Sequence, residues 1–297
     1  MQCHTPYIAI KAGTTLRTEE HPKGRYYEND IAVPCGKCPA CKLRRVSDWC
    51  IRLAEEDKVS SSAFFVTLTY DTNHVPISPK GYMTLNKRDV QLWMKRLRKK
   101  SNNKLRYYLA GEYGEQKYRP HYHVILFNLE DKEYIYDTWK LGNVHVGDVS
   151  TNSMAYTAKY IDKEKRIPLH QNDDRLKEFS HMSTGVGKSY LYKTVNGKEI
   201  PKHEIFNYHK ADIENNYITS NGYKKPLPRY YRKKIYTEQE LRDQVDLIHT
   251  RKRDSRKEKM DKVKRLYKGK VTILEYEDLE KRGEYNKFYN SSKKKRQ

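Results

Sequence analysis

The amino-acid sequence predicts an α+β fold, in which an antiparallel β-sheet is flanked by helices, with a cysteine-rich N-terminal element before it and a basic C-terminal extension after it. Three observations predict this class. Strand-like and helix-like segments follow one another in mixed order, without the regular alternation of a parallel α/β sheet. Two strand-like runs, 107–113 and 121–127, flank a short polar segment that favours a hairpin. Basic residues dominate the end of the chain.

The composition favours a polyanionic partner. The chain has 297 residues, 36% of them hydrophobic, which suits one compact domain with polar extensions. There are 60 Lys and Arg residues against 38 Asp and Glu, a net charge of +22, so nucleic acid is the first candidate partner. Charge alone identifies no chemistry, and a ribosomal or purely structural basic protein stays open at this point.

No apolar run approaches the roughly 20 residues of a membrane-spanning helix, and the first residues lack a long apolar core before a cleavage site. We therefore expect a soluble protein that is not exported and that has no membrane partner. Of the five cysteines, Cys35, Cys38 and Cys41 are crowded together. This usage suits metal binding or free thiols in a reducing compartment better than a set of disulfides.

The first part of the chain predicts two helices around a strand. Apolar residues recur at helical spacing from Cys38 to about Lys58, directly after the cysteine cluster. Residues 63–70 are rich in β-branched and aromatic side chains, which is typical of a buried strand. Asn86, with Asp89 three residues later, indicates the start of a second helix. Its expected apolar face, opposite basic residues, consists of Val90, Trp93 and Leu97.

The middle of the chain predicts the rest of the sheet. The runs 107–113 and 121–127 are expected to pair through a turn at 114–119, and 143–149 predicts a further short strand. A helix is expected at 151–163, capped by Thr151 or Asn152.

The pattern loosens after residue 170. A second hairpin is expected around Asn196-Gly197, and Thr237 with Glu240 predicts the start of a last helix. From 251 to 270 the chain carries 11 Lys and Arg and 3 Asp and Glu, and 293–296 form a terminal basic cluster.

His121 and His123 are the strongest candidates for metal ligands. Residues two apart in a strand point to the same face, so the two imidazoles lie side by side while Tyr122 points the other way. If the hairpin turns at 114–119, Glu112 lies opposite His121, and its carboxylate completes a set of three ligands on one face. Glu115 is the competing third ligand, but it lies nearer the turn.

Such a site leaves coordination positions for phosphate oxygens and water. Mg²⁺ or Mn²⁺ suits phosphate chemistry, with Mn²⁺ accepting imidazole more readily, and zinc stays open. The competing interpretation, without a metal, is a solvated or hydrogen-bonded histidine pair on an exposed strand. The acidic residue across the hairpin and the apolar run that follows favour the metal site instead.

Tyr156 and Tyr160 lie four residues apart in the expected helix and therefore share one face of it. A tyrosine that attacks a phosphodiester forms a covalent phosphotyrosine and conserves the bond energy for later rejoining. The phenol needs help to ionise, and Lys159 is a candidate cation for this role. With 26 tyrosines in the chain, packing against the sheet is the competing interpretation.

Cys35, Cys38 and Cys41, together with Cys3, have the composition of a four-thiolate zinc site. Plain buried thiols are the equal alternative, and the spacing fits an iron–sulfur cluster less well. The segment Thr184-Gly185-Val186-Gly187-Lys188-Ser189 resembles the end of a phosphate-binding loop, but Met182 replaces the required first glycine, so an ATPase is rejected.

Six motifs, taken together, resemble the replication initiators of small single-stranded DNA bacteriophages of the microvirus (gokushovirus-like) type, in the wider His-hydrophobe-His (HUH) endonuclease superfamily. The resemblance extends from the N-terminus to about Lys234. The motifs are Val33-Pro34-Cys35-Gly36-Lys37-Cys38, Phe65-Val66-Thr67-Leu68-Thr69-Tyr70-Asp71, Gly111-Glu112-Tyr113-Gly114, Arg119-Pro120-His121-Tyr122-His123, Tyr156-Thr157-Ala158-Lys159-Tyr160 and Leu227-Pro228-Arg229-Tyr230-Tyr231.

The resemblance implies a rolling-circle replication initiator. One of Tyr156 and Tyr160 would nick single-stranded DNA at the origin and retain the 5′ phosphate, leaving a 3′ hydroxyl for the host replication machinery, and the other would act at termination. His121 and His123 would hold the divalent metal. Tyr122 stands where an aliphatic residue is frequent, a mild departure that leaves both ligands in place. The expected location is the cytoplasm of the bacterial host.

We expect four regions along the chain: a cysteine-rich helical element at 1–60, an HUH-like nuclease core at 61–170, accessory hairpins on or near the core at 171–236, and a basic helical tail at 237–297. The rival hypothesis is a non-catalytic, zinc-stabilised protein that binds single-stranded DNA through basic helices and tyrosines. A mobilisation or transposition nuclease shares the chemistry and differs in substrate.

Overall fold

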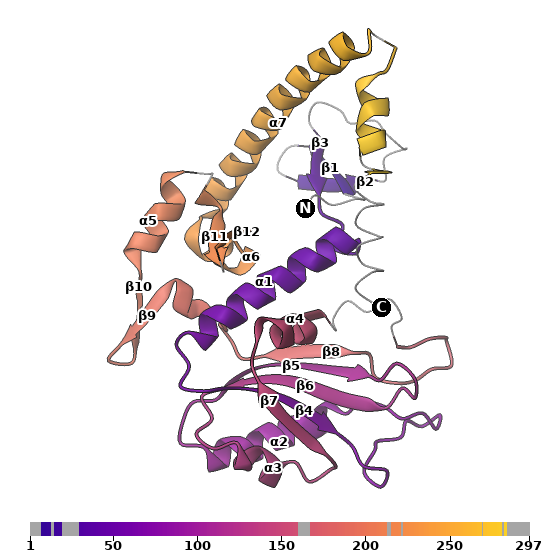
Figure 1. Ribbon diagram of the computed structural model, residues 1–297, viewed down its shortest axis with the longest axis vertical. Coiled ribbons are helices and arrows are strands. Elements are labelled where there is room, and N and C mark those ends of the chain that lie inside the picture. Colours follow the sequence, from indigo (N-terminus) through magenta and orange to yellow (C-terminus); the bar gives the residue numbers. More distant parts are fainter. Residues whose placement is uncertain are drawn as a thin grey trace. The chain divides into compact units, whose positions relative to one another are not determined.

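The computed structural model describes residues 7–12, 15–19, 30–159, 167–212, 215–220, 222–268, 270–280 and 282–283 (Figure 1). The chain forms two compact units. One comprises Arg45–Ile235, and the other combines Met1–Arg44 with Tyr236–Gln297, so the boundary falls inside the first helix. Each unit is described separately, and the four regions expected from the sequence remain a prediction.

The larger unit is built on a five-stranded antiparallel sheet in the order β7-β4-β6-β5-β8 (Figure 1). The strands are β4 (Ala63–Thr69), β5 (Arg106–Tyr113), β6 (Pro120–Phe127), β7 (Val144–Asp148) and β8 (Phe179–Met182). Helices lie on both faces of this sheet, so the expected α+β class and antiparallel sheet are confirmed. The edge strand β8 was not expected, because it is short and carries His181 and Ser180 among its four residues.

One face of the sheet is covered by α2 (Lys87–Lys100) and α3 (Glu133–Thr138). Asn86 caps α2, and its side chain accepts a hydrogen bond from the Arg88 backbone N–H. The expected apolar face of α2 is buried, with Trp93 and Leu97 fully inaccessible. It packs against Val66, Leu68, Tyr122, Val124 and Leu126 of the two central strands, which form the largest core cluster.

The opposite face is covered by α1 (Pro39–Asp57), from Arg45 onward, and by α4 (Thr151–Lys159). Leu53 of α1 and Met154 of α4 pack with Tyr108, Ile125 and Phe127 of the sheet. Both helices agree with the expected positions as far as the chain is described. Residues 160–166, where the helix was expected to continue, lie outside the described residues.

The rest of this unit consists of short elements: η2 (Lys188–Tyr190), β9 (Tyr192–Val195), β10 (Lys198–Pro201), α5 (His203–Ala211), β11 (Tyr217–Ser220), β12 (Tyr223–Pro226) and α6 (Arg229–Ile235). The expected second hairpin is β9–β10. Its turn residues Asn196 and Gly197 have φ values of 49° and 74°, the left-handed conformation that this turn requires.

The segment that resembles a phosphate-binding loop instead holds helices together. The backbone N–H of Gly187 donates to Glu56 of α1 at 2.7 Å, and Tyr231 of α6 donates to the Gly187 carbonyl at 2.7 Å. A Cβ atom on Gly187 would lie 2.4 Å from the Arg52 carbonyl oxygen, so only glycine fits. Gly187 therefore serves the packing of α1 and α6 in this structure.

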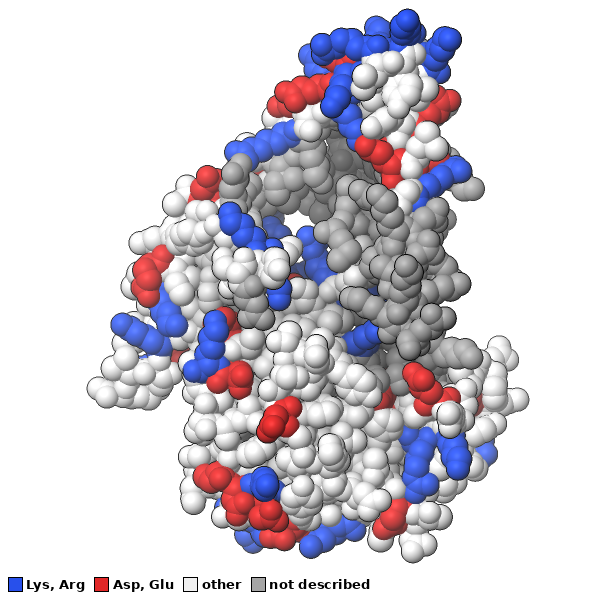
Figure 2. Space-filling model, in the orientation of Figure 1, with Lys and Arg blue, Asp and Glu red and all other residues white. Residues whose placement is uncertain are grey.

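The smaller unit contains a three-stranded sheet and a long helix. The strands β1 (Tyr7–Ala12), β2 (Thr15–Glu19) and β3 (Asp30–Val33) pair in the order β2-β1-β3. Thr237 and Glu240 form the expected capping box at the start of α7 (Glu238–Leu266). Figure 2 shows Lys and Arg side chains gathered over the C-terminal half of this helix. Across the described ranges, no helix combines the length and apolar character needed to span a membrane.

Candidate active site and metal centre

The β5–β6 hairpin brings three candidate ligands together. Glu112 lies directly opposite His121 in the strand register, as the sequence predicts. The side chains of His121, His123 and Glu112 offer ligand atoms that all lie within 4.8 Å of one another. Tyr122 points to the other face, where it is fully buried. The alternation of the strand thus places the histidines on the face opposite α2 and α3.

Both imidazoles converge on one carboxylate oxygen. Nε2 of His121 lies 2.6 Å from Oε1 of Glu112, and Nε2 of His123 lies 3.0 Å from the same atom. Glu112 is 1% exposed and His123 5%, whereas His121 is half-buried and reaches the surface. Two imidazole nitrogens and one carboxylate oxygen around one point form a donor set that Mn²⁺, other transition metals and zinc accept. The residues therefore fit a divalent metal, without selecting among these ions.

Contacts behind the histidines fix their orientation. Nδ1 of His121 lies 3.1 Å from the Arg119 carbonyl oxygen. Because a carbonyl only accepts hydrogen bonds, this Nδ1 carries a proton and Nε2 faces Glu112. Nδ1 of His123 lies 3.1 Å from Oγ1 of Thr67, its register partner on β4. Such partners hold metal-binding imidazoles in place and set their tautomer.

Arg119 fastens the hairpin turn to the sheet. Its guanidinium donates two hydrogen bonds to the carbonyl of Tyr70, at 3.2 and 2.9 Å, just beyond the end of β4. The turn itself closes through hydrogen bonds between Gly114 and Arg119 and between Tyr118 and Gly114. Glu115 lies exposed in this turn, outside the three-residue cluster. The geometry thus gathers Glu112 rather than Glu115 with the histidines.

Tyr156 of α4 lies beside the cluster. Its ring centroid is 5.1 Å from that of His123 and 6.3 Å from that of Phe65, in both cases edge to face. Thr157 and Ala158 are buried against the sheet, while Tyr156 stays 48% exposed. Burial, and then the charges of Glu112 and Glu115, raise the pKa of the Tyr156 phenol. A cation at the cluster would act in the opposite direction.

The other members of the expected tyrosine motif are less defined. Lys159 is exposed in the last turn of α4. Tyr160 lies outside the described residues, so its relation to the cluster stays a prediction. His74, on the exposed loop after β4, is paired with Asp71 at 2.8 Å and lies outside the three-residue cluster.

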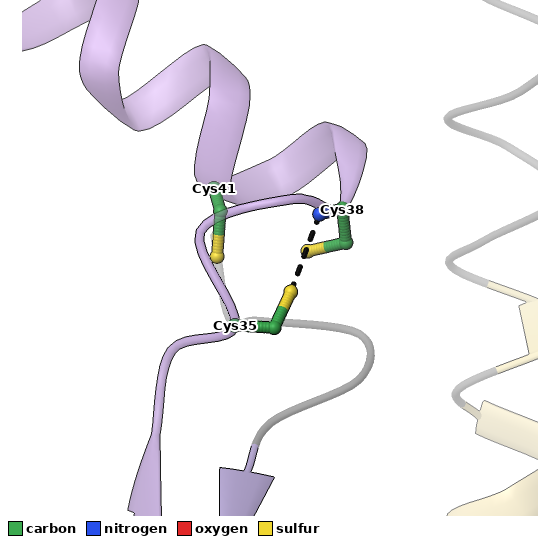
Figure 3. A group of neighbouring side chains, drawn as sticks. All are labelled: Cys35, Cys38 and Cys41. Atoms are coloured by element: carbon green, nitrogen blue, oxygen red, sulfur yellow. Dashed lines mark hydrogen bonds between the residues drawn. The ribbon is translucent and has the colours of Figure 1, made fainter. Parts of the chain in front are cut away.

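A second candidate metal site lies in the smaller unit. The sulfur atoms of Cys35, Cys38 and Cys41 all lie within 4.8 Å of one another where the chain enters α1 (Figure 3). The Cys38 backbone N–H donates to the Cys35 sulfur at 3.2 Å, and the Lys37 N–H at 3.4 Å. Backbone donors of this kind stabilise thiolates. Cys3, the expected fourth ligand, lies outside the described residues.

Three supporting residues were not identified from the sequence. Thr67 and Phe65 contact His123 from β4, and Arg119 holds the turn. Thr67 and Phe65 belong to a quoted motif, but their roles depend on which strands pair, and Thr67 lies 56 positions before its histidine. The signal that was available is the spacing of two within β4, which places Phe65 and Thr67 on one face.

Known proteins resemble this chain over the stretch that carries the site. A family model whose description begins "Replication-associated protein ORF2" matches residues 63–165, the stretch that contains β4, the hairpin and α4. No solved structure matches the chain significantly.

Three curated proteins are similar over most of this chain. Replication-associated protein VP4 of Bdellovibrio phage phiMH2K is 28% identical over 260 residues, which cover 78% of this chain and 76% of that protein. Replication-associated protein ORF2 of Spiroplasma virus 4 is 28% identical over 80% of this chain and 75% of that protein. Replication-associated protein ORF4 of Chlamydia phage 1 is 23% identical over 67% of this chain and 52% of that protein. The resemblance to phage replication initiators is therefore confirmed.

Proposed function

We propose that this chain is a rolling-circle replication initiator that nicks single-stranded DNA at the origin with a tyrosine. The observation that carries the proposal is the position of Tyr156, whose ring packs 5.1 Å from that of the candidate metal ligand His123. The replication-associated names of the relatives support the role in DNA replication. We also propose that the sheet and its helices represent the HUH endonuclease fold.

The proposed metal centre consists of His121, His123 and Glu112. A bound Mg²⁺ or Mn²⁺ ion would supply Lewis-acid polarisation of the scissile phosphate. The protein's own part is to hold the two imidazoles in place through Arg119 and Thr67. The exposure of Tyr156 leaves room for DNA to approach its hydroxyl.

The proposed reaction is a transesterification. The Tyr156 oxygen forms a bond to phosphorus, the bond from phosphorus to the 3′ oxygen breaks, and a 5′-phosphotyrosine results. The phenolic proton passes to water, and the departing 3′ oxygen takes up a proton, so no nucleotide is consumed. The exposed Lys159 is proposed to favour the phenolate. Tyr160 is proposed as the second nucleophile, which acts when the circle is closed.

A covalent adduct tests this proposal. The full chain is incubated with an origin-containing single-stranded oligonucleotide and Mg²⁺ or Mn²⁺, and the adduct is measured on a denaturing gel. We expect an adduct that disappears in the Tyr156→Phe/Tyr160→Phe double variant. Tyr136→Phe is the matched control, since Tyr136 is 41% exposed on α3, across the sheet. Binding of this oligonucleotide without any adduct would contradict the proposal and favour the non-catalytic DNA-binding protein.

The single variants separate replication from related reactions. If the two tyrosines alternate, removing either one abolishes closure and second cleavage but leaves a first nick by the other. A nuclease that mobilises or transposes DNA would need only one of them for its reaction. The 3′ hydroxyl left by the nick is the end that a DNA polymerase extends. We therefore propose that the chain acts with host replication proteins in the cytoplasm of the bacterial host.

The three-cysteine cluster favours a structural Zn²⁺ ion as a second proposal. The three convergent sulfurs and the backbone donors to Cys35 support it, and Cys3 is the proposed fourth ligand. Elemental analysis of the purified chain should show about one zinc ion, which the Cys38→Ser/Cys41→Ser variant loses. Cys50→Ser is the control, because Cys50 lies outside the cluster. Zinc-free protein with unchanged folding would indicate plain thiols.

A further inference from the structure

A small basic pocket lies between α1 and α6 in the larger unit. It has a volume of about 260 Å³. Four basic side chains, one carboxylate and two aromatic rings dominate its lining, contributed by Arg45, Asp48, Trp49, Arg52, Arg229, Tyr230 and Lys233, together with Pro228. Pro228, Arg229 and Tyr230 come from a sequence motif that neither the metal centre nor the tyrosine pair uses.

The floor of the pocket is rigid. The Arg52 guanidinium lies between two rings, 4.2 Å from the centroid of Trp49 and 4.0 Å from that of Tyr230. Its Nε and one terminal nitrogen both donate to the Val186 carbonyl, at 3.0 and 2.9 Å. Asp48 accepts from the Arg229 backbone N–H at 3.4 Å. Three segments that are distant in sequence are therefore locked together around the pocket.

The charge balance indicates an anionic ligand. Arg229 and Lys233 are exposed at the rim, and Arg45 is half-buried beside them. Four basic side chains and one carboxylate give the lining a net positive charge, which favours an anionic ligand. Burial also lowers the pKa of Arg52, which a nearby anion would offset.

The size of the pocket indicates which kind of anion it accepts. Its volume lies below the roughly 300 Å³ at which pockets for whole small molecules begin. It therefore has room for one phosphodiester group but is small for a larger organic molecule. The ring of Trp49 also lies 4.7 Å from that of Tyr108, on the sheet face that carries Glu112. Tyr108 precedes Glu112 by four residues on β5, a distance along the strand of about 13 Å.

We propose that this pocket binds a backbone phosphate of the single-stranded DNA, at a distance from the bond that is cleaved. The inference takes the identity of the DNA from the proposed function, but it requires no cleavage. A second contact of this kind would fix the position of the strand relative to Tyr156, since phosphate contacts set register rather than sequence preference.

Salt dependence of DNA binding is the first test. The full chain and an Arg229→Gln/Lys233→Gln variant bind a labelled origin oligonucleotide without added divalent metal, and affinity is measured against salt concentration. Loss of the contact to one phosphate should reduce the salt slope by about 0.7 and weaken binding by roughly fivefold at about 0.1 M salt. Lys95→Gln/Lys99→Gln is the matched control, because it removes the same charge from exposed positions of α2, across the sheet. Equal losses of DNA affinity in the two double variants would overturn the inference.

Trp49 provides a second, local readout. The other two tryptophans, Trp93 and Trp139, are 0% and 2% exposed, so acrylamide should quench mainly Trp49. Bound oligonucleotide should protect this fluorescence in the full chain and in the Lys95→Gln/Lys99→Gln control, but not in the Arg229→Gln/Lys233→Gln variant. The Trp49→Phe variant shows which part of the fluorescence comes from Trp49.

The two proposals fail in different ways. Protection of Trp49 by the oligonucleotide, with no covalent adduct in the presence of metal, would contradict the nicking reaction and leave the phosphate pocket standing. An adduct with no protection of Trp49 would overturn the pocket alone. Protection by inorganic phosphate but not by DNA would assign the pocket to a free anion and likewise overturn the inference.

Discussion

The two faces of the five-stranded sheet use the same strands for different purposes. On one face, Tyr122, Val124 and Leu126 of β6 are buried beneath α2 and α3. On the other face, His121 and His123 of the same strand lie with Glu112 beside α4, and His121 reaches the surface. The face under α2 and α3 therefore holds the strands in place through apolar packing. The opposite face carries the convergent polar groups.

Even the polar atoms of the packed face serve packing. The hydroxyl of Tyr122 accepts from the Asn86 N–H and donates to the Asn86 carbonyl, both at 2.9 Å, and it also meets the Tyr70 hydroxyl at 2.8 Å. Burial raises the pKa of Tyr122 to about 12, so this phenol stays neutral. The tyrosine found between the two histidines therefore anchors the start of α2, a task that an aliphatic residue cannot perform.

The largest expected effect comes from the open face. We predict that His121→Gln/His123→Gln lowers metal-dependent nicking by roughly 10³-fold or more. Glutamine supplies a donor toward the buried Glu112 carboxylate, so the free energy of unfolding without metal should change by less than about 1 kcal/mol. Adduct formation and chemical denaturation check the two parts. Nicking at the original rate would remove the histidines from the mechanism.

On the packed face, Trp93→Ala should have the opposite pattern. Removing this fully buried side chain should lower the free energy of unfolding by about 3 to 5 kcal/mol. Metal affinity, measured by calorimetry at a temperature where the variant is folded, should stay within about twofold, because α2 lies across the sheet from the ligands. A large loss of metal affinity in folded protein would show that the faces are coupled.

The edge of the packed face should be sensitive to acid. Arg175 donates to Asp173 at 2.7 and 2.8 Å and lies over the rings of Tyr113 and Tyr118. The hydrogen bonds from Arg175 hold the pKa of the Asp173 carboxyl well below its usual range. Its contribution to stability is therefore complete above the unfolded-state pKa of about 3.9 and is lost as the pH falls below it.

We predict that Asp173→Asn is less stable than the parent chain by about 3 kcal/mol at pH 7 and that this gap narrows from pH 5 downward. Urea denaturation across this pH range measures it. A gap that stays constant between pH 7 and pH 2 would mean that the pair contributes nothing through its charge.

The smallest expected effect is on the contact behind His123. Thr67→Val keeps the shape of the side chain but removes the hydroxyl that lies 3.1 Å from Nδ1. Metal affinity should fall by about tenfold, whereas Trp93→Ala leaves it almost unchanged. Titration with Mn²⁺ measures the affinity, and Thr69→Val, one pair further along β4, is the control. Equal affinities in the parent and Thr67→Val proteins would assign the hydroxyl to packing alone.

Much of the site was predictable because it is local. A hairpin that turns at 114–119 fixes the register of its two strands, so Glu112 opposite His121 followed from the spacing alone. The N-caps at Asn86 and Thr237 were recognisable for the same reason. By contrast, β8, β11 and β12 have four residues each, too few to show a period, and β8 pairs with a strand about 70 residues earlier.

The sequence by itself determined the α+β class, the three candidate ligands and the helix that carries Tyr156, because hydrophobic periodicity and turn chemistry act over a few residues. Only the tertiary structure decided that Thr67 supports His123, that Tyr156 lies beside the ligands, and that α1 and α6 enclose a basic pocket. These contacts join segments far apart in the chain, and their positions depend on how the helices pack on the sheet rather than on any local pattern.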